Sequence, residues 1–535
     1  MIRDQFNNPS PLKPVRSLRN DRKRILTSAD AGKIIPLNYA PLLRMDAVQR
    51  AQFQYQFDMT ETPELLMNGV KVRLQTHVIP FMAFARHQKS MDALNRSYAG
   101  QPIIEGGANV PFFDTALAGV HGANEIYKTL GIHADATDTL NTSLIEAYNV
   151  LVNFMYKNRS PNITERALTD TSLASAFWDH SAMANIVPDF DQAMMDGEVP
   201  LQGLGNLPVA GITRVGGGTD GSGNPADMDR FTDHARIGGS AQYMQFDVAA
   251  SGVSSIQVEL ANAGLTWSLS TLELAKKTVA FAKIREKMSG VDDDYVLDLL
   301  MAGIQLPEQE MSRPMLVADN STLLGYNRRW ATDAANLSEA VTTGSATLGN
   351  KYRTPIINSG GIVLTTAQIV PEQVFERQKD YFLYTTQVSQ LPEYTRDYLD
   401  PEKVSVIENS HLDVLHATGE DPFGYAPLNV VEWDRDIPAI GGKYYRPTDD
   451  AFSEDRQRVW SNTTLNPELT ADMYIVGELN NTVFASTNTD NFEIVGRGAM
   501  QISGHTHFGQ MLTESTGSDY DAVLAKVDQT KIVKP

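Results

Sequence analysis

The sequence predicts a mainly β protein built from antiparallel sheets. Two segments near the start alternate apolar and polar residues, the first of them without a break, and further candidate strands lie in the last third of the chain. Helical patterns and long loops separate these two groups of strands. Strands that pair in space although they are far apart in sequence are typical of a Greek-key or jelly-roll sandwich. We therefore expect one β-sandwich with long helical and loop insertions.

The first alternating segment covers residues 50–59, and the second covers residues 70–79. In the first, the polar positions are Arg50, Gln52, Gln54, Gln56 and Asp58; in the second, they are Lys71, Arg73, Gln75 and His77. A period of two puts the polar and apolar side chains on opposite faces of a strand. A shift of one residue would expose Phe53 and Phe57, so the register is strongly fixed. Both segments are predicted to be half-buried strands with one wet face.

The residues around these strands predict shorter elements. Residues 30–37 form an apolar run that Pro36 interrupts, which predicts an edge strand or a strand end. Residues 62–69 begin with a capping threonine followed by proline and end with Asn-Gly, so they predict one helical turn between the two strands.

Three helices and three further strands complete the expected elements. Residues 142–157 carry the apolar stripe Leu144, Ala147, Leu151 and Phe154. Residues 270–288 begin with a capping box and end before a glycine, and residues 292–301 predict another helix. The predicted strands are residues 430–433, 473–477 and 491–502. In the last of these, Gly496 and Gly498 indicate a bulge or a close approach of the backbone.

The composition limits the classes of function. The chain has 535 residues, 42% of them hydrophobic, and it contains no cysteine, which excludes disulfides and thiolate sites. The first residues lack the apolar run of a signal peptide, and no stretch approaches the roughly 20 apolar residues that span a bilayer. We expect a soluble protein without membrane insertion, made and kept in the cytoplasm of its producer.

Charge is distributed unevenly along the chain. The net charge is −20, but residues 1–24 carry seven basic and two acidic residues, a balance of +5, which leaves −25 for the rest. The basic residues are Arg3, Lys13, Arg16, Arg19, Arg22, Lys23 and Arg24. Three prolines and the lack of an apolar period predict that this arm is extended or disordered in isolation. It is either a solvated tail or an arm that lies along a polyanion or a neighbouring subunit.

These features predict a domain organisation. Residues 1–24 form a basic arm, and residues 25–535 form a single sandwich domain with insertions. Residues 195–240 are poor in apolar residues and rich in glycine, aspartate and asparagine, which predicts an exposed insertion. Residues 310–360 show no clear pattern and are expected to form a further loop region.

No sequence motif strongly indicates a catalytic, nucleotide-binding or metal-binding site. Residues 216–221 match G-x-G-x-x-G, but the Gly and Pro residues that follow cannot open a helix at once, so a flexible loop is the better interpretation. His505 and His507 would lie on one strand face without further visible metal ligands. Asp292 to Asp294 suit a helix start as well as a cation. No serine elbow or catalytic acid pair stands out, so we expect no enzyme activity, cofactor or metal.

Several segments resemble the major capsid protein of the Microviridae, small tailless phages with single-stranded DNA. They are Thr27-Ser-Ala-Asp-Ala-Gly-Lys-Ile-Ile-Pro36, the strand pair at 50–79 with His77-Val-Ile-Pro80, Ser254-Ser-Ile-Gln257, Leu272-Glu-Leu-Ala275, Asp421-Pro-Phe-Gly-Tyr-Ala-Pro-Leu-Asn-Val-Val-Glu-Trp433, Trp460 and Leu465-Asn-Pro467. The resemblance spans roughly residues 25–480 in islands, and is strongest at residues 421–433. The sequence looks divergent from the best-known branches.

The resemblance implies an eight-stranded antiparallel jelly roll and a structural role in the virion. Sixty copies, built from pentamers, would form a T=1 icosahedral shell around a circular single-stranded DNA genome, assembled in the cytoplasm of a bacterial host. The implied partners are further copies of the chain, the packaged DNA, a small basic DNA-packaging protein, a DNA pilot protein and a host-cell receptor. The basic arm would then face inward and contact DNA or the packaging protein. Rival classes are a carbohydrate-binding or carbohydrate-active β-sandwich and another virion component such as a spike.

Overall fold

The structure is a computed structural model, and its chain divides into two compact units. The first comprises Met1–Ala193, Arg285–Tyr398 and Val404–Pro535, and the second comprises Met194–Ile284 and Leu399–Lys403. The residues that the structure describes are 16–102, 107–160, 162–179, 185–188, 312–330, 340–395, 404–434, 439–445, 458–461, 467–487 and 490–505, together with short strands between residues 198 and 268.

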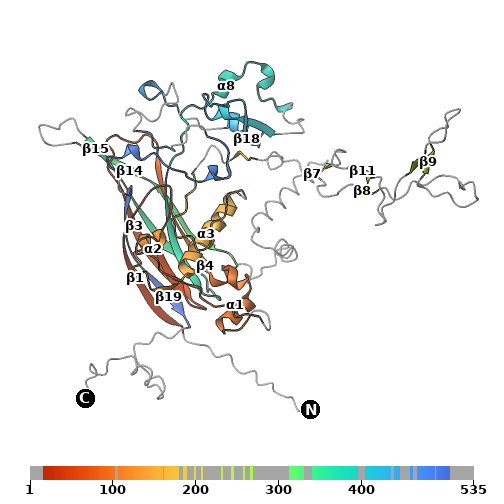
Figure 1. Ribbon diagram of the computed structural model, residues 1–535. Coiled ribbons are helices and arrows are strands. Elements are labelled where there is room, and N and C mark those ends of the chain that lie inside the picture. The colour runs from red at the N-terminus through yellow and green to blue at the C-terminus, as the bar shows by residue number, and fades with distance from the viewer. Residues whose placement is uncertain are drawn as a thin grey trace, which may run out of the picture. The chain divides into compact units, whose positions relative to one another are not determined.

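The first unit is mainly β, and its two largest sheets are antiparallel (Figure 1). Sheet 1 has the order β1 (Ser17–Ala29), β19 (Phe492–Gly504), β3 (Ala47–Met59), β15 (Ala340–Tyr352) and β14 (Gly325–Trp330). Sheet 2 has the order β13 (Met315–Leu323), β4 (Val70–Pro80), β16 (Gly361–Pro371) and β2 (Ile34–Leu42). The predicted mainly β, antiparallel class is therefore confirmed.

The inward faces of the two sheets share one hydrophobic core. Phe53 and Phe57 on β3 and Ile494 on β19 belong to the same buried cluster as Leu74 on β4 and Val363 on β16. The period of two explains this arrangement, because every second side chain of each strand points to the same face. Burial of these large apolar side chains is the main force that holds sheet 1 against sheet 2.

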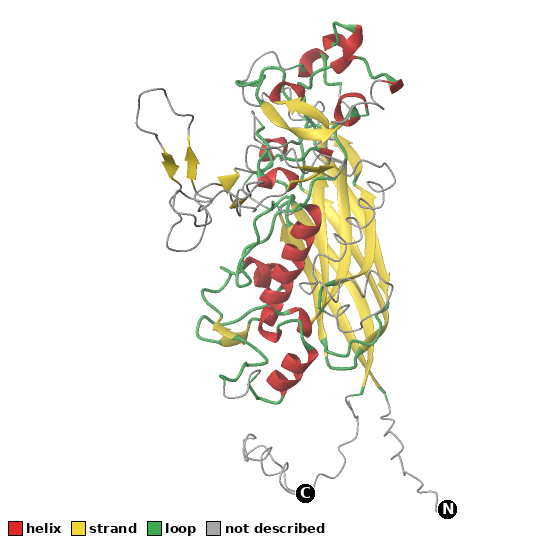
Figure 2. Ribbon diagram, turned by 90° about the vertical axis from the view of Figure 1, so that its right-hand side faces the viewer, coloured by secondary structure: helices red, strands yellow, loops and turns green. Residues whose placement is uncertain are grey.

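A second core covers the outward face of sheet 2. Helix α3 (Ser143–Arg159) packs there, with Tyr148 and Leu151 in the same buried cluster as Leu364 of β16. The Tyr148 hydroxyl donates to the Ile34 carbonyl at 2.6 Å and accepts from the Ala174 amide at 2.9 Å, which joins the helix to β2. Figure 2 shows the helices along one side of the strands. Strand β16, in the middle of sheet 2, is thus buried on both faces, whereas β13 and the first half of β4 keep exposed positions.

The remaining elements of the first unit lie in the connections between these strands. They are η1 (Phe81–Ala83), η2 (Ala85–His87), α1 (Met91–Tyr98), β5 (Thr115–Leu117), α2 (Glu125–Leu130), β6 (Thr139–Asn141), α8 (Tyr381–Tyr384), η5 (Val388–Gln390), β17 (Val404–Glu408), η6 (Asn409–His411), β18 (Pro422–Pro427), α10 (Val430–Trp433), η7 (Gly442–Tyr444), η9 (Ala471–Tyr474) and η10 (Asn481–Val483). Strand β5 pairs with β6, and β17 pairs with β18.

In the second unit, the structure describes three antiparallel pairs of short strands. They are β12 (Thr266–Ser268) with β7 (Glu198–Pro200), β11 (Gln257–Val258) with β8 (Leu207–Pro208), and β10 (Tyr243–Gln245) with β9 (Arg230–Thr232). The predicted insertion at residues 195–240 falls in this unit, and most of its residues lie outside those described.

Several predicted elements are confirmed. Strands β3, β4 and β19 and helix α3 occur where the sequence predicts them, and β2 is an edge strand of sheet 2. At Gly498, a Cβ atom would lie 2.5 Å from Cγ of Phe53, so the backbones of β19 and β3 approach closely there. The register shift between these strands occurs at Gln501 and Ile502, away from both glycines.

Other predictions are wrong. Residues 62–69 contain no helical turn: Thr62 forms an isolated β-bridge with Thr342. Residues 430–433 are helix α10, and residues 471–474 form the 3-10 helix η9 where a strand was predicted. The expected loop region at 310–360 contains β13, β14 and β15. The small residues of β15, among them Gly344, Ala346 and Gly349, hide its alternation from a hydrophobicity pattern.

The wet face predicted for β4 is correct only for its first half. Lys71 and Arg73 are partly or well exposed, but Gln75 and His77 are buried, because the chain after β4 folds back over this face.

Some predictions concern segments outside the described residues. These are the predicted helices at 270–288 and 292–301, the glycine motif at 216–221, Asp292 to Asp294 and His507.

Candidate nucleic-acid interface

The outward face of sheet 1 carries a group of exposed basic side chains, which we call the basic face. Its members are Arg22 and Arg24 on β1, Arg497 on β19, Arg50 on β3 and Lys351 on β15. All of them occupy exposed positions, which alternate with mostly buried positions on β3, β15 and β19 and with half-buried positions on β1. The same alternation that fills the core therefore presents these cations to solvent.

The strand register brings the cations close together. Arg24 lies opposite Arg497, and Arg497 lies opposite Gln54 on the next strand. In the neighbouring row, Gln52 on β3 lies opposite Ala499 on one side and opposite Lys351 on the other. Adjacent strands are about 4.8 Å apart, so each row forms a short polar ladder across the sheet. Long arginine and lysine side chains from two rows can then reach a single extended chain of phosphates.

The basic face has an unbalanced charge. Arg24 and Arg497 are like charges directly opposite each other, an arrangement that destabilises a strand pair. Among the described residues, none of the five cations forms an ion pair with an acidic side chain. The acidic residues of this face, Asp58 and Glu493, lie opposite each other near one end of the strands. An anionic ligand would relieve the repulsion between the cations.

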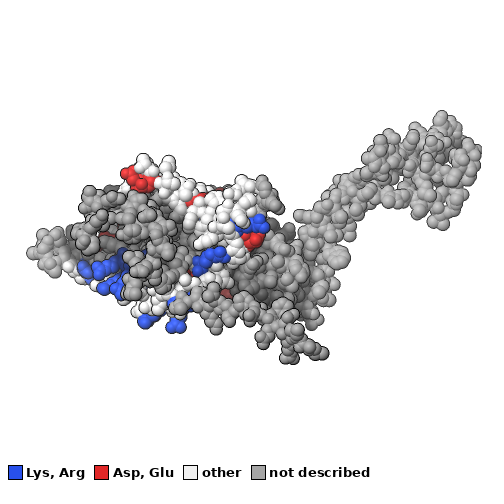
Figure 3. All heavy atoms as spheres, turned by 90° about the horizontal axis from the view of Figure 1, so that it is seen from below, with Lys and Arg blue, Asp and Glu red and all other residues white. Residues whose placement is uncertain are grey.

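The chemical character of this face favours backbone recognition over base recognition. Arginine, lysine and glutamine side chains donate hydrogen bonds to phosphate oxygens, and these contacts carry no sequence information. The exposed positions of β1, β3, β15 and β19 hold no aromatic residue on which a base could stack. Figure 3 shows that Lys and Arg side chains gather on one side of the described surface seen from below. This arrangement suits a polyanion of any sequence.

The structure divides the basic residues predicted from the N-terminal arm into three groups. Arg3 and Lys13 lie outside the described residues. Arg22 and Arg24 point outward on β1, as a polyanion contact requires. Arg16, Arg19 and Lys23 make contacts within the protein. The assignment of residues 17–24 to an arm that is extended or disordered is corrected, because these residues pair with β19 as part of β1.

The inward-turned cations connect β1 to β2 and the turn that follows it. Arg19 forms an ion pair with the buried Asp46 at 2.8 Å and donates to the Pro41 carbonyl at 2.6 Å. Arg16 donates to the carbonyls of Met45 at 2.9 Å and Ser503 at 3.0 Å. These contacts link an edge strand of sheet 1 to an edge strand of sheet 2, so they have a structural role.

Lys23 belongs to the same structural group. Its ammonium donates to the Tyr39 carbonyl and lies 4.3 Å from the centre of the Tyr39 ring. Burial lowers the pKa of the Lys23 ammonium, although nearby Asp21 acts in the opposite direction. Lys23 is therefore less suited than Arg22 or Arg24 to contact a polyanion.

Three members of the basic face were missed at the level of sequence. Arg50 could have been found, because it occupies the wet face of the alternating segment at 50–59. Arg497 follows from the same rule applied to residues 491–502, where it stands between the two glycines. Lys351 gave no signal, because its strand was not recognised. Only the pairing of strands remote in sequence reveals that these residues share one surface.

Metal-binding groups and membrane-spanning helices were sought in the described part of the chain. No group of three or more His, Cys, Asp or Glu residues within it could hold a metal ion. None of the helices in the described regions is both long and apolar enough to cross a membrane. A scan against models of protein families gives no match for this chain, and no curated protein matches its sequence.

Proposed function

We propose that this chain is the major capsid protein of a small icosahedral virus with a single-stranded DNA genome, related to the Microviridae. In this proposal the fold is an eight-stranded jelly roll with insertions. Sixty copies, arranged as pentamers, form a T=1 shell that is assembled in the bacterial cytoplasm. The protein then has a structural role in the virion, not a catalytic one.

The observation that carries this proposal is the nested pairing of the strands. Numbered in chain order, the eight long strands of the sandwich are β1, β2, β3, β4, β13, β15, β16 and β19. The first pairs with the eighth, the second with the seventh, the third with the sixth and the fourth with the fifth. The pairs of β19 with β3 and of β16 with β4 then complete the two sheets. This is the order expected when a long antiparallel ribbon rolls up into a jelly roll, and β14 adds an edge strand to sheet 1.

The basic face favours a capsid over other jelly-roll proteins. Jelly rolls also occur in lectins and cupins, so the fold alone does not decide the function. The whole chain carries −20, which would repel DNA, but the basic face concentrates positive charge on one sheet. We propose that this face points to the shell interior and contacts the packaged DNA. The insertions would contact neighbouring subunits, a pilot or packaging protein, and the host receptor.

Assembly can be tested by negative-stain electron microscopy of the purified full-length chain. Closed shells of uniform size are expected, with pentamers as the smaller species in size-exclusion chromatography. A stable monomer that forms no shell under any assembly condition, or a trimeric or pentameric spike without a shell, would contradict the proposal. Turnover of a carbohydrate substrate would favour the enzymatic alternative.

The role of the basic face can be tested with the double variant Arg24→Gln/Arg497→Gln. Binding of single-stranded DNA would be measured by fluorescence anisotropy over a series of salt concentrations. The slope of log affinity against log salt should decrease by about 1.4 in magnitude, since each lost phosphate contact removes about 0.7. The matched control is Arg96→Gln/Lys157→Gln, which removes two exposed cations of the helices. Equal slopes for both double variants would show that the basic face does not bind DNA.

A further inference from the structure

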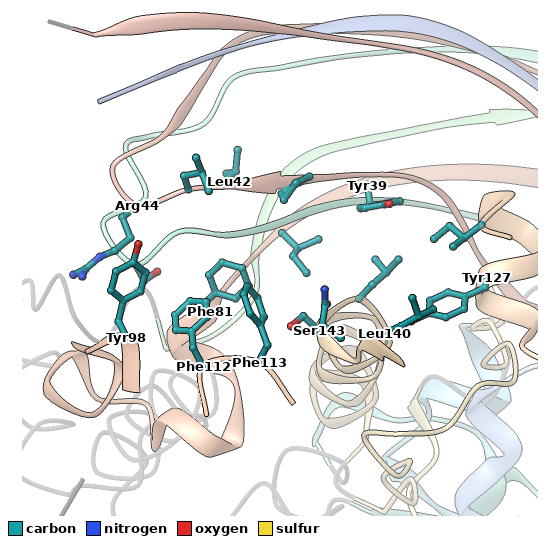
Figure 4. Close-up of a pocket in the computed structure, with 17 residues that line it drawn as sticks. Tyr39, Leu42, Arg44, Phe81, Tyr98, Phe112, Phe113, Tyr127, Leu140 and Ser143 are labelled. Atoms are coloured by element: carbon teal, nitrogen blue, oxygen red, sulfur yellow. The ribbon is translucent and has the colours of Figure 1, made fainter. Parts of the chain in front are cut away.

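An aromatic cavity of about 710 Å³ lies between β2 and the helical insertion that covers sheet 2. Six of its lining side chains are aromatic: Tyr39, Phe81, Tyr98, Phe112, Phe113 and Tyr127. Leu42 and Leu43, from the end of β2, complete one wall. Figure 4 shows these side chains arranged around a common space, with Arg44 and Tyr98 at one end.

The rings of this cavity are held in a fixed arrangement. Phe112 packs edge to face against Phe81 at 5.3 Å, Tyr98 at 5.3 Å and Phe113 at 4.7 Å between ring centres. The Arg44 guanidinium lies 5.3 Å from the centre of the Tyr98 ring and donates to Asn95 at 2.6 Å. Such edge-to-face packing makes the cavity a preformed site and not the result of loose side chains.

The rim of the cavity exposes large apolar side chains. Tyr98 is 61% exposed, Phe113 is 46% exposed and Leu43 is 41% exposed. A preformed apolar cavity with exposed aromatic residues at its rim is typical of a binding site for an apolar or proline-rich ligand. Aromatic-lined grooves bind proline-rich segments in the polyproline II conformation, which loses little entropy on binding.

The protein's own N-terminal segment has the composition that this cavity requires. Residues 9–14 read Pro-Ser-Pro-Leu-Lys-Pro, which includes a P-x-x-P pattern at residues 11–14. Residues 1–15 carry Arg3 and Lys13 against Asp4, a net charge of only +1. Of the remaining basic residues of the predicted arm, Arg16 directly precedes β1 and the other four belong to β1. Residues 1–15 are therefore poorly suited to hold DNA by charge and better suited to an apolar site.

The beginning of the described chain places this segment beside the cavity. The guanidinium of Arg16 donates to the carbonyl of Met45, the residue that follows the cavity wall Leu42 to Arg44. At roughly 3 Å per residue in polyproline II, residues 9–14, which precede Arg16 by two to seven residues, can lie about 6–21 Å from it. The C-terminal segment starts from the same edge, because Gly504 pairs with Ser17, but its only proline is Pro535.

We propose that the aromatic cavity binds the proline-rich stretch at residues 9–14 of the same polypeptide. The N-terminal segment passes from β1 around the turn after β2 and lies against the rings of Tyr98 and Phe112. It thereby covers apolar surface and fixes the edge where sheet 1 meets sheet 2. The inference is independent of the proposed capsid function, since it concerns the folded subunit.

Disulfide trapping can test this proposal in the full-length chain, because the natural sequence contains no cysteine. One double variant, Leu12→Cys/Leu43→Cys, places one thiol in the N-terminal segment and one at the cavity rim. The matched control, Leu12→Cys/Gln501→Cys, places the second thiol on exposed β19, close to the start of β1 but on the outward face of sheet 1. After mild oxidation, the cross-linked fraction is measured by non-reducing electrophoresis with peptide mapping.

We expect the cavity pair to form an intramolecular disulfide at least tenfold faster than the control pair. Adding Pro11→Ala and Pro14→Ala to the cavity pair should reduce its rate to that of the control, because the polyproline II preference is lost. Removal of residues 506–535 should leave the rate unchanged. Equal rates for the two pairs, cross-linking only between different chains at dilute concentration, or no effect of the proline substitutions would each overturn the proposal.

Discussion

The outward faces of the two sheets differ although both belong to the same sandwich. On sheet 1, the outward positions of β3 hold Arg50, Gln52, Gln54 and Gln56, and they are exposed. On sheet 2, every residue of β16 is buried, because helix α3 and its neighbours cover the outward face. The inward faces of both sheets meet in one core.

This difference shows how the same strand pairing can serve two purposes. The uncovered face of sheet 1 keeps a regular pattern that is easily recognised in the sequence and presents charge to a ligand. The covered face of sheet 2 keeps polar residues such as Gln75 and His77, but an inserted helical layer packs against this face and these residues are buried. The predictions below test whether the two faces differ in stability and binding as their burial indicates.

The largest effect on stability is expected when the buried Leu151 side chain of helix α3 is truncated. Leu151→Ala removes a fully buried side chain from the core between α3 and sheet 2, so it should lower the free energy of unfolding by about 2–5 kcal/mol. Gln54→Thr, at an exposed position of sheet 1, should change it by about 0.5 kcal/mol or less. Chemical denaturation of both variants checks this comparison. Similar effects would show that α3 contributes little to the stability of sheet 2.

The covered face of sheet 2 should also make the protein sensitive to acid. Burial lowers the pKa of His77 to about 4, from an ordinary value near 6.5. The folded state therefore keeps His77 neutral while the unfolded state takes up a proton. Stability is complete above pH 6.5 and is lost as the pH falls toward 4, by an amount on the order of 3 kcal/mol.

This dependence can be measured by comparing the wild type with His77→Gln between pH 7 and pH 4. The difference in unfolding free energy between the two proteins should shift in favour of the variant as the pH falls. His87, whose pKa burial also lowers to about 4, should leave a similar residual dependence in both proteins. A difference that stays constant with pH would mean that His77 is protonated equally in the folded and unfolded states.

A smaller effect is expected where β19 and β3 approach each other in sheet 1. Gly498→Ala should cost about 1–3 kcal/mol, because the new methyl group would overlap the Phe53 ring and the Gln52 carbonyl. Gly349→Ala, on β15 of the same sheet, meets no atom within 4 Å of its Cβ and should be nearly neutral. Thermal unfolding of the two variants distinguishes close backbone approach from a general glycine effect. Equal losses would exclude the steric explanation.

The smallest effect on stability is expected on the basic face itself. Arg24→Gln/Arg497→Gln should change the free energy of unfolding by about 0.5 kcal/mol or less, and the sign should be stabilising, because it removes like charges on facing strands. The same variant should lose DNA affinity, as described above. If it unfolds at a much lower denaturant concentration, these residues have a structural role and the DNA experiment cannot be interpreted as a loss of contact.

Sequence reasoning succeeded where a local pattern agrees with burial. The alternation in residues 50–59 predicted β3, its register and its wet face, because sheet 1 is covered on one side only. The glycines of β19 correctly indicated close backbone approach. The mainly β class followed from these segments alone. The same alternation places Arg50 and Arg497 at exposed positions, but only the pairing of β3 with β19 shows that they share one face of a sheet.

The remainder could not be predicted, because it depends on contacts remote in sequence. Strand β15 uses glycine, alanine and threonine at buried positions, so hydrophobicity gives a weak pattern. The alternation of β4 predicts a wet face for Gln75 and His77, and only the inserted helical layer makes that part of the face dry. Arg19 was expected to contact a polyanion, but its partner, Asp46, becomes visible only when β1 lies beside the turn after β2.

The position of β19 between β1 and β3 has a consequence for biosynthesis. Sheet 1 cannot close until its last-made strand leaves the ribosome, roughly 430 residues after β3, which takes about 20–90 s at about 5–20 residues per second. Throughout that time β1 and β3 present open edges able to pair with the nascent chains of neighbouring ribosomes. The yield of folded protein should therefore be sensitive to the rate of translation and to the supply of chaperones.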